Sequence, residues 1–378
     1  MREATTASCW SADHVAKLVD WSAQAMPIID MRRIARPVPG HDTWDMWPVQ
    51  LADGTIARFD GWTVWLALAA PCLPDPDKRH DLARIRLLSE RGGTWRDCGN
   101  LLPDGLNPGS REWAGSAVFD PVSGRLTVFF TAAGRAGEPR PSFIQRLFHA
   151  SARFACDGGV ARAEDWTRAQ ETVVADSRRY LVADQIYGEP GFIRGFRDPA
   201  HFRDPADGAD YLLFTASLAE VNSPWNAGVG LARGQGTGWT LLAPLLTAKG
   251  LNTELERPHV RCRNGLYYLF WSTQRRTFAP DGPTGPNGLY GAVAPALAGP
   301  YVPLNASGLV AANPSQAPLQ AYSWWVTADL DVQGFVDLVD VPASGPVDDP
   351  QWRRAHFGGR PAPVFRIGLD GDRAWVQH

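Results

Sequence analysis

The chain has 378 residues, with 37 Lys and Arg against 40 Asp and Glu, which gives a formal net charge of −3. Proteins that bind nucleic acid usually carry a strong basic excess, so this balance argues against a nucleic-acid partner. Hydrophobic residues make up 44% and charged residues 20% of the chain, as in packed globular proteins. The 16 Trp, 37 Gly and 31 Pro favour short strands joined by shaped loops.

The first residues and the cysteines bear on location and on metal binding. No apolar core of a secretory signal follows Met1, and no stretch reaches the roughly 18 apolar residues of a spanning helix. We therefore expect no membrane partner, and a protein that is cytoplasmic or exported without a cleavable signal peptide. The cysteines are odd in number, widely spaced and without a CxxC pair, which argues against a zinc ribbon and a disulfide framework.

One short helix is predicted near the N-terminus. Ser11 is a suitable N-cap residue. The apolar residues that follow it recur at helical spacing, at Val15, Leu18, Val19 and Trp21. Residues 1 to about 26 are therefore expected to form a helical lead-in.

Strand signals dominate the rest of the chain. Residues 61–68 are β-rich and almost continuously apolar, as an inner strand buried on both faces would be. Three times, a Ser-Gly, Asp-Gly or Asn-Gly turn precedes a strand rich in aromatic and branched residues, at 123–124, 207–208 and 264–265. Strands do not alternate with helices of 10–15 residues, which argues against a doubly wound sheet.

The pattern of hairpins does not decide which closed fold they form. Hairpin-rich chains of this length protect their strand edges as a barrel, a pair of sandwiches or a propeller. The repetition is one of hairpin type and has no fixed sequence period. No linker or composition break marks a boundary, so a single all-β domain over residues 1–378 is predicted.

Three segments break the strand pattern and place acids beside aromatic residues and prolines, at 41–48, 195–202 and 252–259. A retaining glycosidase needs two carboxyl groups about 5–5.5 Å apart, one charged as nucleophile and one protonated as acid. Aromatic neighbours raise the pKa of the acid, while polar hydrogen bonds keep the nucleophile charged. The three segments supply these residue types. With 40 acidic residues in the chain, however, acids at such spacings also occur as turn and cap residues.

The order of the motifs is more specific than any one of them. They include Trp44-Asp45, Arg111-Glu112-Trp113, Phe196-Arg197-Asp198-Pro199, Glu256-Arg257-Pro258-His259 and Ala321-Tyr322-Ser323. Together they resemble glycoside hydrolase family 68, the levansucrases, inulosucrases and related bacterial β-fructofuranosidases, over roughly residues 27 to 376. This resemblance implies a five-bladed β-propeller with a deep, funnel-shaped acidic pocket at one end of its axis. The short helical segment predicted above would precede it.

The resemblance also implies a catalytic role for three carboxylates. Asp45 falls on the family's nucleophile, Glu256 on its acid/base and Asp198 on its transition-state stabiliser. Glu256 would protonate the glycosidic oxygen while Asp45 attacks C2 of the fructosyl unit of sucrose. Glu256 would then deprotonate water or a sugar hydroxyl, which releases fructose or extends a fructan.

The implied substrate-binding residues surround this triad. They are Trp44, Arg111, Trp113, Ser116, Arg197, Glu254, Arg257, Gln274 and Tyr322. Arg197 would hold fructosyl hydroxyls, the two tryptophans would form pocket walls, and Tyr322 would lie near the acid/base. Neighbours on an extended strand point to opposite faces, so Glu256 and Arg257 can serve one pocket only if the chain is kinked beside Pro258.

Two departures from the family pattern lead to further expectations. Gln274 stands where polymer-forming relatives from Gram-negative bacteria commonly have His, which favours hydrolysis and short products. Asn252-Thr253 replaces the Asp that precedes the Glu-x-Glu-Arg run in calcium-binding relatives, so no metal or other cofactor is expected. A levansucrase that builds β-2,6 fructan and an inactive sugar-binding propeller are the alternatives, and the three carboxylates argue against the second.

Overall fold

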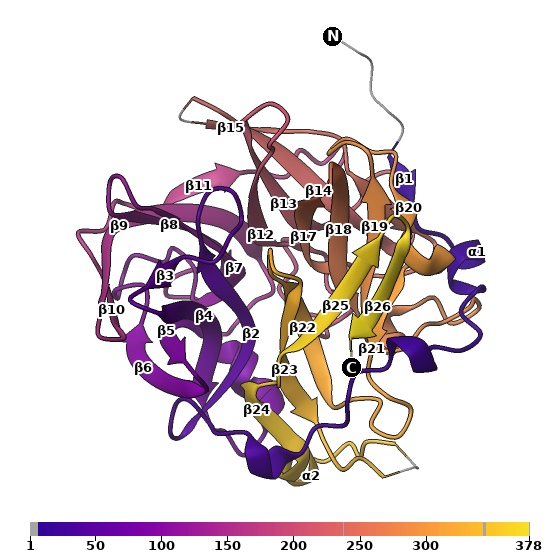
Figure 1. Cartoon of the computed structure of the whole chain (residues 1–378), viewed down its shortest axis with the longest axis horizontal. Helices are drawn as coiled ribbons and strands as arrows, with labels where there is room; N and C mark the ends of the chain where they lie inside the picture. Colours follow the sequence, from indigo (N-terminus) through magenta and orange to yellow (C-terminus); the bar gives the residue numbers. More distant parts are fainter. Residues whose placement is uncertain (1–6, 237, 343–344, 378) are drawn as a thin grey trace.

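The computed structural model describes residues 7–236, 238–342 and 345–377, and strands dominate it (Figure 1). The first two blades are each a four-stranded antiparallel meander with an added strand. Blade 1 contains β2 (His41–Gln50), β3 (Arg58–Phe59), β4 (Trp62–Pro71), β5 (Arg84–Arg91) and β6 (Thr94–Asn100). Blade 2 contains β7 (Arg111–Asp120), β8 (Arg125–Ala133), β9 (Gln145–Asp157), β10 (Val160–Glu164) and β11 (Gln170–Val173).

Three further blades follow in chain order. Blade 3 contains β12 (Phe196–Arg203), β13 (Asp210–Ser217), β14 (Asn226–Gln235), β15 (Gly238–Leu241) and β16 (Leu246–Lys249), with β1 (Ser8–Cys9) added in parallel to β16. Blade 4 contains β17 (Glu256–Arg263), β18 (Leu266–Thr273), β19 (Gly288–Ala294), β20 (Val302–Pro303) and β21 (Leu309–Ala312). Blade 5 contains β22 (Ala321–Val326), β23 (Asp331–Leu338), β24 (Phe357–Pro361), β25 (Phe365–Asp370) and β26 (Arg373–Gln377).

The fold is a five-bladed β-propeller, as the resemblance implied. The first strands of the blades, β2, β7, β12, β17 and β22, are neighbours in a closed ring, and Figure 1 shows them around the centre. A short parallel pairing of Val49 with Ala117 joins β2 to β7. The three predicted turns connect β7 to β8, β12 to β13 and β17 to β18, and each turn glycine has a positive φ. Strand β4, predicted as an inner strand, is buried from Trp62 to Ala70.

Helices are few and short. They are α1 (Ala12–Val15), α2 (Pro350–His356) and the 3₁₀ turns η1 (Ser22–Gln24), η2 (Met31–Arg33), η3 (Pro76–Asp81), η4 (Arg275–Thr277) and η5 (Leu304–Ala306). The predicted helix begins after Ser11 but ends at Val15, so its extension towards Trp21 is wrong. A helix this short has little stability of its own and depends on packing. Val15 is buried whereas Val19 is 89% exposed, so the apolar stripe does not continue against the core.

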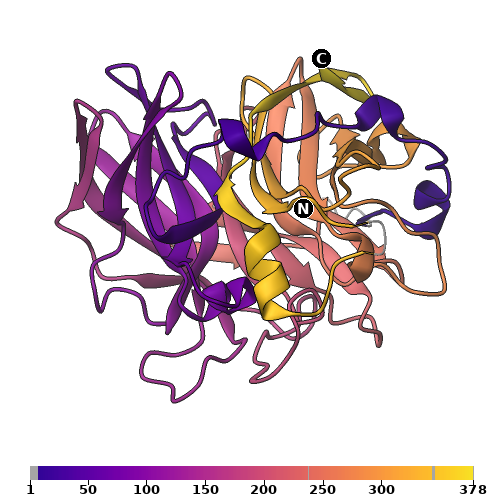
Figure 2. The same cartoon turned by 90° about the horizontal axis from the view of Figure 1, so that it is seen from below.

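The lead-in is held by an aromatic anchor and by strand pairing. Residues 1–6 of the predicted 1–26 segment lie outside the described residues. The Trp10 side chain is fully buried, and its ring packs against Trp271 at 5.3 Å and Tyr290 at 5.0 Å between centroids. The segment then runs along blades 4 and 5 before it enters β2 (Figure 2). This path brings β2 beside the last blade and closes the ring.

Every inner strand is interrupted near its N-terminal end. The pairing register shifts at Trp44/Met46 in β2, Trp113/Gly115 in β7, Arg197/Ala200 in β12, Glu256/His259 in β17 and Tyr322/Trp325 in β22. A bulge of this kind adds a residue and redirects the side chains around it. Because the five interruptions lie near the same ends of neighbouring strands, they aim side chains at one end of the axis.

Candidate active site

Four bulge residues have a backbone conformation that non-glycine residues seldom adopt. Their φ angles are 44° at Asp45, 60° at Asp198, 51° at Arg257 and 59° at Ser323. Such strained conformations persist only where the surrounding structure imposes them, and they cluster at functional sites. The kink expected at Arg257 is therefore present, and it belongs to a set of four around one axis.

Arg257 ties three of these strands together through its backbone and its side chain. Its backbone N–H donates to Asp198 Oδ2 at 3.3 Å, and its Nη1 donates to Ser323 Oγ at 2.7 Å. Its Nη2 donates to the carbonyl of Met46, the residue after Asp45. Arg257 thus links β12, β22 and β2 at the level of the bulges, and its charge acts on the Asp45 carboxyl group.

A second guanidinium gathers the other carboxyl groups. Arg197 Nη2 donates to Glu254 Oε2 and, at 3.0 Å, to Glu256 Oε1. Arg197 Nε lies 3.6 Å from Asp198 Oδ2. Burial works against the Arg197 charge, but the three carboxylates outweigh burial and raise the pKa of this residue. One side chain therefore contacts three acidic groups that come from two different blades.

Glu256 has a separate partner on its second oxygen. The Tyr322 hydroxyl, at the start of β22, donates to Glu256 Oε2. Gln274 lies close enough to the same hydroxyl to affect its pKa, and the Gln274 Oε1 accepts from Arg276 Nε at 2.8 Å. The Glu256 carboxyl is thus held between Arg197 and Tyr322, which leaves its orientation little freedom.

Burial makes proton exchange at neutral pH possible for several of these acids. It raises the pKa of Asp198 to about 6, although the Arg197 charge opposes the shift. Burial also raises the pKa of Asp45, opposed chiefly by Arg257. Burial and the charge of Glu256 raise the pKa of Glu254 above its usual range. Asp198 and Glu254, which contact the same arginine as Glu256, can therefore hold a proton at a higher pH than free carboxyl groups do.

The two predicted wall residues lie on the neighbouring strands β2 and β7. Trp44 is buried, with Arg79 over its ring at 5.3 Å and the His80 ring edge-on at 5.5 Å. Trp113 lies 5.6 Å from the guanidinium carbon of Arg111. Arg111 itself is buried and donates to Glu138 Oε1 at 3.2 Å. Arg111 is thus anchored by the loop between β8 and β9.

Ser116 has a different environment from the other predicted residues. Its hydroxyl donates to the Pro199 carbonyl at 2.8 Å and accepts from the His201 N–H at 2.9 Å. Both partners are backbone groups of β12, so this side chain joins blades 2 and 3. The contact of Ser116 with substrate stays a prediction.

The structure adds two ionisable residues that the sequence did not single out. His80, in η3, lies against Trp44, and burial together with the charges of Arg79, Arg111, Arg276 and Arg197 holds its pKa well below the usual range. Asp337, in β23, is close enough to Arg79 and Asp45 for their charges to act on it, and burial raises its pKa to about 6. Neither lies in a recognisable motif, because each reaches the site from a segment remote from the three carboxylate segments.

Within the described residues, no group of three or more His, Cys, Asp or Glu side chains is arranged to hold a metal ion. Among the same residues, no helix is long and apolar enough to cross a membrane.

The family model described as levansucrase/invertase, that of glycoside hydrolase family 68, matches residues 1–230 and 223–378. The chain belongs to glycoside hydrolase family 68. A levansucrase of Zymomonas mobilis subsp. mobilis is 35% identical over 405 residues, which cover 98% of this chain and 90% of that protein. Levansucrase LscC of Pseudomonas savastanoi pv. glycinea is 34% identical over 377 residues, which cover 88% and 82%.

Solved structures agree with this assignment. The inulosucrase from Halalkalicoccus jeotgali bound to kestose has a TM-score of 0.89 and 40% identity, with 98% of this family 68 chain and 95% of that one covered. The catalytic domain of the Microbacterium saccharophilum K-1 β-fructofuranosidase has a TM-score of 0.83 at 23% identity, with coverage of 100% and 93%, and supports the fold alone. The chain is an enzyme of the glycoside hydrolase and fructosyltransferase kind.

Proposed function

We propose that this family 68 enzyme acts on sucrose as a retaining β-fructosidase, which mainly releases glucose and fructose and also forms short fructo-oligosaccharides. The observation that carries the proposal is the convergence of Asp45, Asp198 and Glu256 beside two buried arginines. The partners are sucrose and fructo-oligosaccharides, and the reaction needs no cofactor.

The first half-reaction forms a covalent intermediate. The protonated Glu256 carboxyl gives its proton to the glycosidic oxygen as the Asp45 carboxylate attacks C2 of the fructosyl unit. The bond between C2 and that oxygen breaks, and glucose leaves. Asp198, at its bulge in β12, offers negative charge to the cationic transition state. Arg257 stabilises the charged form of Asp45 before the attack.

The second half-reaction reverses these roles. Glu256, now a carboxylate, takes a proton from water or from a sugar hydroxyl, whose oxygen attacks C2 and expels Asp45. The acceptor decides whether fructose or a longer saccharide is released. Gln274 accepts from Arg276 and lies close to Tyr322, the partner of Glu256, and we infer that it faces the approaching acceptor. We take the neutral amide at this position as the basis for the preference for water.

A second function is favoured by the relatives. The two curated relatives named above are levansucrases, which supports fructan synthesis from sucrose with the same intermediate. The two functions share all three carboxylates and differ only in the acceptor.

The products formed from sucrose over time separate these functions. We expect free fructose to follow glucose closely, with a minor share of short oligosaccharides seen by chromatography. The Gln274→His variant is expected to raise the share of transferred fructosyl units about twofold or more. A large excess of glucose over fructose, with polymer that precipitates in ethanol, would overturn the hydrolase preference in favour of fructan synthesis. Failure to consume sucrose would overturn both functions.

His80 is expected to contribute to sucrose binding. Its neutral ring offers one donor and one acceptor, and no hydrogen bond of its ring is found within the described residues. Loss of one such contact typically costs about 1–2 kcal/mol, so His80→Ala should raise KM for sucrose about tenfold and change kcat less. His149→Ala is the matched control, because the His149 ring bonds to Thr172 in blade 2. An unchanged KM in His80→Ala would contradict this role.

A further inference from the structure

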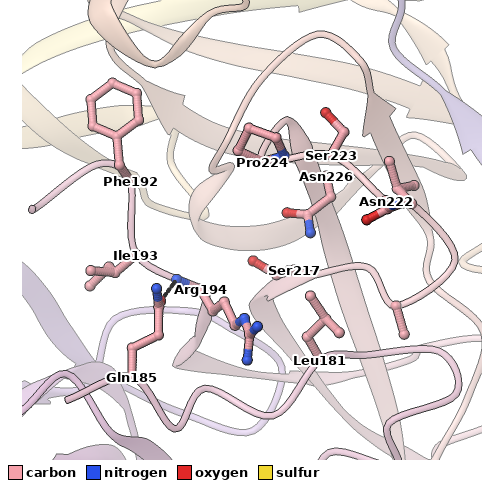
Figure 3. Close-up of a pocket in the computed structure, with 12 residues that line it drawn as sticks. Leu181, Gln185, Phe192, Ile193, Arg194, Ser217, Asn222, Ser223, Pro224 and Asn226 are labelled. Atoms are coloured by element: carbon pink, nitrogen blue, oxygen red, sulfur yellow. Dashed lines mark hydrogen bonds between the residues drawn. The ribbon is translucent and has the colours of Figure 1, made fainter. Parts of the chain in front are cut away.

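The two ends of the propeller axis differ. At the end that carries the five bulges, the connecting segments leave open space, such as the hollow of about 460 Å³ between Arg194 and Asn222 in blade 3 (Figure 3). Towards the other end, Gly54, in the turn from β2 to β3, lies next to the Arg261 side chain of β17. Arg261 follows Glu256 by five residues, which is on the order of 15 Å along a strand. Arg261 therefore lies well away from the catalytic carboxylates.

Arg261 is a buried cation whose partners use only part of its hydrogen-bonding capacity. It is 5% exposed. Its Nε donates to the Val326 carbonyl at 2.7 Å, and its Nη1 donates to the Val260 carbonyl at 3.1 Å. A guanidinium has five N–H donors, and the buried Nη2 has no partner among the described residues. Buried polar groups normally find partners, so this place lacks an acceptor.

The charge of Arg261 also lacks a counter-charge. Burial alone lowers the pKa of Arg261 to about 9, and no acidic group of the described residues opposes this shift. The guanidinium is still charged at neutral pH. His259, two residues earlier, adds no negative charge, because a histidine is either neutral or positive. A buried charge is strongly destabilising unless it is paired, so the missing acceptor is expected to be negative.

Arg257, on the same strand, is a useful comparison. The guanidinium groups of Arg257 and Arg261 lie 5.5 Å and 5.4 Å from the centre of the Trp325 ring. The charges of Asp45 and Asp198 favour the charged form of Arg257. Arg261 has the same aromatic neighbour and two carbonyl partners, but no anion. The comparison indicates that a negative group completes the environment of a buried arginine in this propeller.

Space for a small ligand is present beside Gly54. This glycine has a φ of 84°, and a Cβ placed on it would meet Arg261 Nη1 at 3.5 Å, with no other atom of the described residues outside the turn within 4 Å. The turn itself is held in place, since the Gly54 N–H donates to the Leu51 carbonyl at 3.0 Å and Gln50 Nε2 donates to the Gly54 carbonyl at 2.9 Å. The open face of Gly54 is thus directed at the guanidinium.

We propose that chloride, or an anion of similar size and charge, binds between Gly54 and the Arg261 guanidinium, away from the catalytic carboxylates. One negative charge balances one guanidinium, and the anion accepts the N–H groups that have no partner. Gly54 belongs to blade 1, Arg261 to blade 4 and Val326 to blade 5. The bound anion therefore stabilises the place where the last two blades meet the first.

The stability of the full chain in chloride tests this site. Tm is measured in sodium chloride and in sodium gluconate at equal sodium concentration, because gluconate is too large for the space beside Gly54. A site of millimolar affinity should raise Tm by about 2–4 °C at about 0.5 M chloride. The measurement needs no sucrose, so its result is independent of the proposed function.

Two substitutions remove the site in different ways. Arg261→Gln removes the charge. Gly54→Asp supplies a carboxylate in place of the anion, at a positive φ that Asp tolerates, and it leaves Arg261 intact if Arg261→Gln fails to fold. Each should lose at least about two-thirds of the chloride-dependent shift in Tm. Arg84→Gln is the matched control, because Arg84 is paired with Glu112 at 2.6 Å, so this variant should have a lower Tm and keep the full shift.

Bromide locates the anion directly. Crystals grown in sodium bromide should show anomalous bromine density beside the Arg261 guanidinium, and crystals of Gly54→Asp should lack it. Equal Tm in chloride and gluconate, or a shift that survives both substitutions, would overturn the site. Water density without an anomalous signal at this position would overturn it as well. Bromide density in a protein whose Tm does not respond to chloride would mean an adventitious ion only, and would also reject the proposal.

Discussion

Asp45→Asn is expected to lower kcat for sucrose by about four to six orders of magnitude, the scale seen when a catalytic nucleophile is removed. The amide cannot form the fructosyl ester, so the covalent intermediate that both half-reactions share is not formed. The fold should tolerate the change, because Asn adopts the positive φ of 44° found at this bulge more readily than most residues do. Glucose release measures kcat, and thermal unfolding reports whether the propeller remains intact.

Asp42→Asn is the matched control on the same strand. Asp42 is fully buried and accepts from Arg36 at 2.8 Å and from Arg354 at 2.6 Å, so its charge joins the segment before β2, β2 itself and α2. Removing one member of a buried ion pair costs about 3–5 kcal/mol, so Asp42→Asn should lower Tm and leave kcat nearly unchanged. If Asp45→Asn kept more than about 1% of the parental kcat, Asp45 would not be the nucleophile.

The local pattern of the chain predicts its hairpins well but not their closure. Turns at Gly124, Gly208 and Gly265 follow from residues that favour a positive φ. A barrel, a sandwich and a propeller use the same hairpins, and contacts between blades, such as Val49 with Ala117, distinguish them. Five blades could therefore be predicted only from the family resemblance.

The site shows the same division between local and long-range information. The kink at Arg257 could be predicted, because Glu256 and Arg257 are adjacent and a proline follows. The positive φ angles of Asp45 and Ser323 have no such local signal, since packing around the axis imposes them. His80 and Asp337 were missed because their roles depend on neighbours from other segments. The helix beyond Val15 was over-predicted because periodicity does not report whether a core is available to Val19.

Glu256→Gln is expected to abolish most sucrose turnover, with kcat lower by about two to four orders of magnitude. The glucose leaving group needs a proton that the amide cannot give, although Gln keeps the size of the side chain and can still bond to Arg197 and Tyr322. An aryl β-fructofuranoside with an acidic phenol needs no such proton, so its first half-reaction should survive. Added azide, which attacks C2 without a general base, should then restore turnover and yield a fructosyl azide.

The pH dependence of the parent and of Glu256→Gln completes this test. Below about pH 6 the Asp198 carboxyl, whose pKa burial raises to about 6, gains a proton, so activity should fall on the acid side in both proteins. On the alkaline side the parent should lose activity as the Glu254 carboxyl, beside Glu256, loses its proton, above the usual range of a glutamic acid because burial raises the pKa of Glu254. With the aryl substrate and azide, Glu256→Gln should show no alkaline fall. An alkaline fall of unchanged position in that variant, or the absence of azide rescue, would assign the acid/base to another residue.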